Sequence, residues 1–182
     1  MNNQQYSINE YQLNQVEVRL KLSESRTYYS ENPITDADSA VLFMSEILRD
    51  LDREWVCVLN LDTKLHPVNF NVVSVGDTDR AIAPVQNIMK SILLSGRGAS
   101  GILLHTHPSG DPTPSAEDLN LTRKAVLAGK IMDLPILDHV ILGSVTGRTF
   151  SIRSSFPELF DAPVEERDVV DMLKKKSRGR DR

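Results

Sequence analysis

Two histidines and an aspartate are the residues of this 182-residue chain that are best suited to chemistry. The segment from His105 to Asp118 has the sequence HTHPSGDPTPSAED. Residues i and i+2 of a strand leave the same face, about 6.6 Å apart along the backbone, so His105 and His107 can converge on one ion. Catalytic zinc sites commonly use three His or carboxylate ligands and leave the fourth position to water. The spacing therefore predicts a zinc site held by His105, His107 and Asp118.

The segment that joins the histidines to Asp118 is suited to holding them in fixed relation. Its three prolines lower the entropy cost of a rigid loop, and Gly110 can supply a positive φ. Ser115 precedes Asp118 by three residues, which is the spacing of a helix N-cap and an acid at N3. We expect Ser115 to begin the helix that carries Asp118, and the same geometry places its hydroxyl close to a zinc-bound water.

The expected zinc site also needs a proton acceptor, and two glutamates are candidates. Zinc lowers the pKa of its bound water to about 7, and a nearby carboxylate can carry the proton to a leaving amine. Glu54 begins a predicted inner strand, and the apolar run after it would hold it in place. Glu46, in the preceding helix, is the competitor. Spacing alone does not decide between the two.

The hydrophobic pattern predicts the elements that position these residues. Period-2 alternation and short apolar runs predict strands over 16–22, 54–61, 68–75, 101–104, 135–142 and 148–152. Helical spacing predicts helices over 37–51, 84–94, 116–128 and 164–176, the third of them ended by Gly129. The strands at 54–61 and 68–75 should form a hairpin. This order predicts an α/β sandwich around a mixed sheet.

Length, composition and charge limit the class of protein. The chain has room for one compact domain plus tails, and 40% hydrophobic with 25% charged residues excludes disorder from end to end. We predict a flexible lead-in over 1–15, one domain over 16–160, and a helix with a basic tail over 161–182. The net charge is −4, yet the last nine residues carry +5. Such a tail is usually solvated, with nucleic acid or an acidic partner as the alternative contact.

The single cysteine, Cys57, excludes an intrachain disulfide and a multi-cysteine zinc site. It also excludes a nucleobase deaminase, which needs H-x-E and P-C-x-x-C. The N-terminus lacks the basic and apolar regions of a signal peptide, and no apolar run reaches the length of a membrane span. We therefore expect a cytoplasmic protein without membrane contact.

The central motif and its surroundings resemble a known family. The pattern H-x-H-P-x6-S-x-x-D of the JAMM/MPN metalloproteases matches the segment from His105 to Asp118 without a gap. The flanking sequences, EWVCVLNLDTK before it and LTRKAVLAGKIMDLPILDHVILG after it, resemble the JAB-type domain of the bacterial RadC family over roughly residues 42–156.

The resemblance implies a cytidine deaminase-like three-layer sandwich with one zinc ion per chain, bound by His105, His107 and Asp118. It implies that Glu54 is the general acid/base and that Ser115 helps to stabilise the oxyanion. The implied activity is that of a zinc metallopeptidase or isopeptidase, in which zinc-activated water attacks an amide carbonyl of a peptide or protein substrate.

Two departures from the family are visible. Full-length RadC proteins carry a helix-hairpin-helix region before this domain, and the 35 or so residues here are too few for one, so we expect a short form with a weaker case for DNA binding. Thr106 stands where the family usually has Asn, and its side chain should point away from the metal.

The sequence also allows other functions and other roles for its remaining histidines, cysteine and tryptophan. The main alternative is a metal-binding accessory module in DNA repair or mobile-element DNA transactions, without proteolysis and with the basic tail as contact. A metal phosphoesterase would need further His and Asp ligands. We expect His139 to be a core or supporting histidine rather than a ligand, His66 to be solvated, Cys57 to be a buried inert thiol, and Trp55 to lie in the core.

Overall fold

The computed structural model describes residues 32–48, 51, 53–76, 83–165, 167 and 170. Within these ranges, the strands are β1 (Trp55–Leu61), β2 (Pro67–Val75), β3 (Ser100–His107), β4 (Ile136–Gly143) and β5 (Thr149–Ser151). The helices are α1 (Ala37–Leu48), α2 (Val85–Leu94), α3 (Ala116–Met132), α4 (Ile152–Ser155) and α5 (Glu158–Asp161). The predicted lead-in, the strand over 16–22 and the basic tail lie outside the described residues.

The strands form one mixed sheet in the order β2-β1-β3-β4-β5. β1 runs antiparallel to both β2 and β3, which confirms the predicted hairpin. β3 and β4 are parallel and are joined by α3, whereas β5 returns antiparallel to β4. The two central strands therefore end at the same edge of the sheet, where β3 finishes at His107 and β4 at Gly143.

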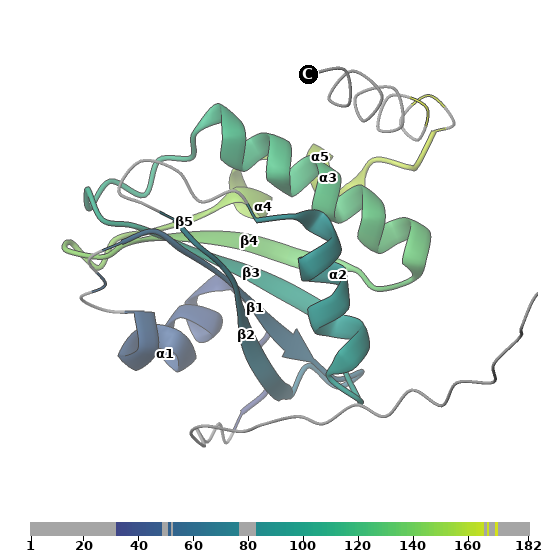
Figure 1. Cartoon of the computed structure of the whole chain (residues 1–182), viewed down its shortest axis with the longest axis horizontal. Helices are drawn as coiled ribbons and strands as arrows, with labels where there is room; N and C mark the ends of the chain where they lie inside the picture. The colour runs from purple at the N-terminus through teal and green to yellow at the C-terminus, as the bar shows by residue number, and fades with distance from the viewer. Residues whose placement is uncertain are drawn as a thin grey trace, which may run out of the picture.

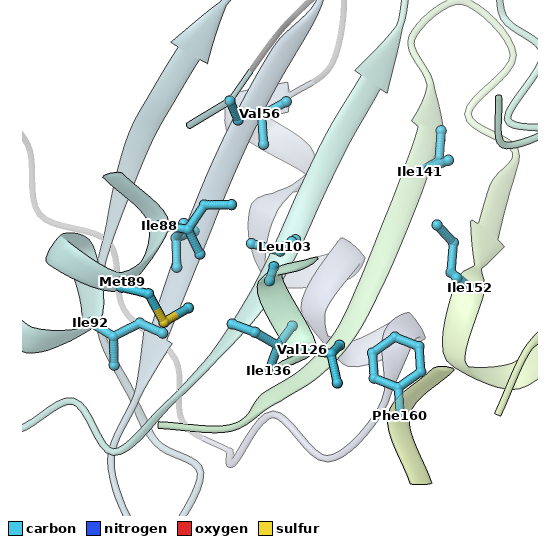
Figure 2. Packing of buried hydrophobic residues seen from close by; sticks show 13 residues of the cluster. Val56, Ile88, Met89, Ile92, Leu103, Val126, Ile136, Ile141, Ile152 and Phe160 are labelled. Carbon is cyan, nitrogen blue, oxygen red and sulfur yellow. The ribbon is translucent and has the colours of Figure 1, made fainter. Parts of the chain in front are cut away.

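Helices cover both faces of this sheet (Figure 1). Alternate residues of β1 divide between two buried clusters, with Cys57 and Leu59 facing α1 and Val56 and Val58 facing α2 and α3. Figure 2 shows the cluster that contains Val56 and Val58, in which Ile88 and Ile92 of α2 lie against the strands. The alternation follows from the period of two in a strand. The predicted three-layer α/β architecture is confirmed.

The predicted end of α3 at Gly129 is wrong. The helix continues to Met132 and ends at Asp133, which has a left-handed φ of 55° and donates its N–H to the Gly129 carbonyl. A Cβ at position 129 would lie 2.5 Å from the Leu134 carbonyl oxygen. Gly129 is thus required by the close approach of the chain that enters β4, and does not stop the helix.

Three further differences concern the ends of elements. β3 extends three residues beyond the apolar run 101–104 that predicted it, because the segment from His105 to His107 continues the strand pairing. The short helices α4 and α5 were not predicted. The helix predicted over 164–176 does not begin at Val164 or Glu165, and most of it lies outside the described residues. No helix within the described ranges is long and apolar enough to cross a membrane.

Candidate metal centre

His105 and His107 project from the face of β3 that α3 covers, as their spacing predicts. His105 is buried and His107 is half-buried, and their rings meet edge to face with centroids 4.8 Å apart. Thr106, between them, points to the opposite face. Both imidazoles therefore lie at the edge of the sheet where β3 and β4 end.

The orientation of His107 is set by the loop that follows it. Its Nδ1 lies 2.8 Å from the Asp111 carbonyl oxygen, which can only accept, so Nδ1 carries a proton. In the neutral ring the lone pair then belongs to Nε2, which faces Asp118 Oδ2 at 3.6 Å and Glu54 Oε1 at 3.9 Å. A histidine that binds metal through one ring nitrogen usually donates a hydrogen bond from the other, which fixes the tautomer and the orientation of the ring.

The loop itself is held against the end of β4. Gly110 has the positive φ that the sequence predicts, 83°, and its carbonyl accepts a hydrogen bond from Thr146. Its oxygen would lie only 2.2 Å from a Cβ at position 143, so Gly143 is required by this contact. The Ser144 N–H donates to the His107 carbonyl. Residues 143–146 thus support the loop from outside, a role that sequence reasoning missed because it depends on contacts between distant segments.

Ser115 and Asp118 form the predicted start of α3. The Ser115 hydroxyl accepts the Asp118 N–H at 3.1 Å, while Asp118 Oδ2 accepts the Ser115 N–H at 2.8 Å and its hydroxyl at 2.7 Å. This is a complete capping box. The other carboxylate oxygen, Oδ1, lies 2.9 Å from Nδ1 of His105. The cap therefore turns the carboxylate toward the histidine.

Glu54 lies immediately before β1, and its backbone is held on both sides. Its carbonyl accepts the Gly76 N–H at 2.8 Å. The Thr106 hydroxyl accepts the Trp55 N–H at 2.9 Å and lies 3.4 Å from the Arg53 carbonyl, so it contacts both neighbours of Glu54. The Glu54 side chain reaches His105, with Oε1 2.5 Å from Nε2. Nothing is described for the side chain of the competing candidate, Glu46.

The structure brings together four of the residues that the sequence singled out, Glu54, His105, His107 and Asp118. One atom each from Glu54, His105 and His107 lie within 4.8 Å of one another, and this group could hold a metal ion. Asp118 is in contact with both histidines but approaches His105 through its other nitrogen, Nδ1. Which carboxylate binds the metal and which acts as base stays a prediction.

The charges of this cluster depend on one another. Burial alone would lower the pKa of His105, but its contacts with Asp118 and Glu54 outweigh burial and raise that pKa to about 9. The hydrogen bond from His105 lowers the pKa of Glu54. Burial would raise the pKa of Asp118, but both histidines and Ser115 outweigh it and lower that pKa well below its usual range. Both carboxylates are thus ionised at neutral pH.

The remaining residues singled out by the sequence lie outside the cluster. His139 is fully buried and is not part of the group that could hold a metal. His66 is exposed beside Asp62. Cys57 is buried, and burial raises its pKa to about 12, as expected of an inert thiol. Trp55 is only half-buried, at the border of the cluster under α1.

This chain is similar in sequence to proteins of one known family. The model of the "RadC-like JAB domain" family matches residues 34–156. A "UPF0758 protein" of Methanococcoides burtonii is 35% identical over 142 residues, which cover 76% of this chain and 61% of the relative. Another "UPF0758 protein", of Desulfitobacterium hafniense, is 38% identical over 133 residues, covering 70% of this chain and 58% of the relative. The chain thus matches about three fifths of the length of these relatives. By the extent of the family match, this chain belongs to the RadC family of JAB-domain proteins.

Proposed function

We propose that this chain is a zinc-dependent hydrolase that cleaves peptide or isopeptide bonds. The observation that carries the proposal is the contact between Glu54 and the two histidines, with Oε1 2.5 Å from His105 Nε2 and 3.9 Å from His107 Nε2. This contact places a carboxylate that can transfer protons next to imidazoles that can bind metal. It lies at an edge of the sheet where the side chains of Glu54 and His107 are 13% and 14% exposed. Water and substrate could therefore reach the cluster.

The donor set fits a zinc ion. Two imidazoles and carboxylate oxygens within a few ångströms of one another are ligands that zinc prefers. Nδ1 of His105 is buried and lies 2.9 Å from Asp118 Oδ1, but the two atoms are not aligned as a hydrogen bond. We assign His105, His107 and Asp118 as the residues that would hold the ion. When bound, zinc would supply Lewis-acid chemistry by polarising an amide carbonyl and lowering the pKa of water.

Glu54 is the residue of this cluster that would move protons. Its lowered pKa keeps it ionised at neutral pH, so it can accept a proton from the attacking water. The same carboxyl can then return the proton to the leaving amine, which needs one to depart. The backbone contacts with Gly76 and Thr106 hold Glu54 in place during this exchange.

Ser115 would support the oxyanion only after a local change. Its hydroxyl has one proton, which is directed to Asp118 Oδ2. To donate to a substrate oxygen, the hydroxyl must rotate away from that carboxylate. Ser115 is exposed, so a substrate could reach it. Its role as N-cap does not depend on this step.

The experiment that tests the proposal separates metal binding from proton transfer. Metal content is measured on purified wild type, Glu54→Gln, Asp118→Asn and His107→Ala, and each is assayed on a library of peptides and ubiquitin-like conjugates. We expect Glu54→Gln to keep zinc and to lose about 10²–10⁴-fold in turnover. Asp118→Asn and His107→Ala should lose zinc. The exposed variant His66→Gln is the control and should behave as wild type.

Two results would contradict these assignments. If Glu54→Gln lost zinc while Asp118→Asn kept it, the two carboxylates would have the opposite roles. If Glu54→Gln cleaved the same conjugates as fast as wild type, Glu54 would take no part in the reaction.

A further inference from the structure

His139 of β4 lies beside the candidate metal centre but has no role in the chemistry proposed for it. It is fully buried, and its ring stacks on that of His105 with centroids 5.8 Å apart and an interplanar angle of 17°. It pairs in the ladder with Leu103, two residues before His105. The His139 ring therefore packs against the ring of His105, the buried histidine of the cluster.

The hydrogen bonds of Thr122 fix the tautomer of His139. The Thr122 hydroxyl lies 2.7 Å from the Asp118 carbonyl oxygen and 2.7 Å from Nδ1 of His139. A carbonyl can only accept, so the single hydroxyl proton goes to Asp118, and His139 must donate from Nδ1. With its proton on Nδ1, the neutral ring has a bare Nε2.

This arrangement ties the first turns of α3 to the sheet. The chain of hydrogen bonds runs from His139 in β4, through Thr122, to the backbone of Asp118. The Asp118 carboxylate is held at the same time by Ser115 on one oxygen and faces His105 with the other. The position of Asp118 relative to His105 is thus set from the cap and from the sheet together.

Packing alone would not favour a histidine at this position. Nε2 of His139 is buried and has no hydrogen-bond partner among the described residues, and an unpartnered buried polar atom costs stability. A phenylalanine would stack on His105 without that cost. Of these two side chains, only the histidine can donate to Thr122.

We propose that His139 is a positioning residue, which acts through Thr122 to hold the Asp118 carboxylate at the metal-binding cluster. The inference rests on the proposed function only in that Asp118 is taken as a metal ligand.

The test measures zinc affinity of the full chain by competition with a chromophoric chelator. Thr122→Val keeps the shape of the side chain and removes both hydrogen bonds. We expect it to weaken zinc binding by about tenfold or more, as the loss of a residue that orients a metal ligand does. Thr122→Ser should restore the affinity. His139→Phe should weaken it similarly, and the double variant should be no weaker than either single one, because one chain of bonds is broken in each case.

Ser91→Ala is the matched control. Ser91 is a buried helix residue that accepts a hydrogen bond from Asn60 far from the cluster, so this variant loses a buried hydroxyl but should keep wild-type zinc affinity. Wild-type affinity in folded Thr122→Val would overturn the proposal. So would an equal loss in Ser91→Ala, since the effect would then reflect general destabilisation.

A second readout does not depend on metal. Long-range ¹H–¹⁵N spectra of the zinc-free protein should show His139 as the Nδ1–H tautomer. Thr122→Val should shift the His105 ring nitrogens, because Asp118 Oδ1 faces Nδ1 of His105, and Ser91→Ala should not. If wild type binds no zinc, the proposed function fails, and unchanged His105 signals in Thr122→Val would still overturn the positioning role.

Discussion

Raising the pH should destabilise the zinc-free protein between about pH 6.5 and 9. The contacts of His105 with Asp118 and Glu54 raise its pKa to about 9 in the folded protein, whereas an unfolded histidine titrates near 6.5. The stabilisation from the protonated ring is fully present below pH 6.5. It is lost as the pH rises through 9, because the unfolded chain releases the proton first.

Among the described residues, no other group with a shifted pKa opposes this effect between pH 6.5 and 9. The pKa of Asp118 and that of Glu54 are both lowered, so their contributions are constant above the usual carboxyl range. Burial lowers the pKa of His139 to about 3, which affects stability only below about pH 6.5. Burial raises the pKa of Cys57 to about 12 from 9.0, which matters only near pH 9 and above. The pKa of His107 is raised by Asp118, so His107 acts in the same direction as His105.

The size of the effect follows from linkage. One group that is protonated only in the folded state changes the unfolding free energy by up to about 1.4 kcal/mol per pH unit, and hence by roughly 3 kcal/mol between pH 6.5 and 9. The assay is urea unfolding with a chelator present, repeated at steps of pH across this window. Saturating zinc should oppose the fall, because metal binding requires deprotonated imidazoles and strengthens with pH.

Two controls make the result specific to the cluster. His66→Gln alters an exposed histidine and should keep the wild-type slope. Asp118→Asn removes the carboxylate beside His105 and should reduce the slope. A constant unfolding free energy from pH 6.5 to 8.5 would refute the reasoning, and so would an unchanged slope in Asp118→Asn.

Three substitutions test the contacts that support the cluster. Gly143→Ala places a Cβ against the Gly110 carbonyl and should cost about 1–3 kcal/mol in urea unfolding while weakening zinc binding by calorimetry; wild-type zinc affinity would show that the loop is not held there. Thr106→Val removes the hydroxyl that contacts both neighbours of Glu54, so turnover should fall with zinc content unchanged, and Thr106→Ser should recover the turnover. Equal turnover in wild type, Thr106→Val and Thr106→Ser would exclude a positioning role for the hydroxyl. Ser115→Ala removes the N-cap of α3 and should cost about 1 kcal/mol in urea unfolding of the zinc-free protein, and an unaltered urea midpoint would contradict the capping role.

Short-range patterns were sufficient to predict the main parts of the cluster. His105 and His107 had to share a face once they lay on one strand, because strand side chains alternate with a period of two. Ser115 and Asp118 had to form a cap once a helix began there, because the hydroxyl and the carboxylate reach each other's N–H across three residues. Both expectations depend on backbone geometry that neighbouring residues impose, and both are confirmed.

Patterns of the same kind failed where distant segments meet. Gly129 resembles a helix stop in the sequence, but the chain entering β4 passes so close that only glycine fits there. Gly143 carries no local signal, and its importance follows from the Gly110 loop lying across it. The side-chain partner of His139, Thr122, is seventeen positions away and joins it only because α3 crosses β4.

The sequence by itself determined which residues are available for metal and proton chemistry, the strand and helix that carry them, and the family to which the chain belongs. Only the tertiary structure decided that Glu54 contacts both histidines and that Asp118 faces the other nitrogen of His105. The physical reason is that a side chain's direction and charge depend on its neighbours in space. Glu54 and His105 are 51 positions apart and meet only because β1 and β3 pair in one register.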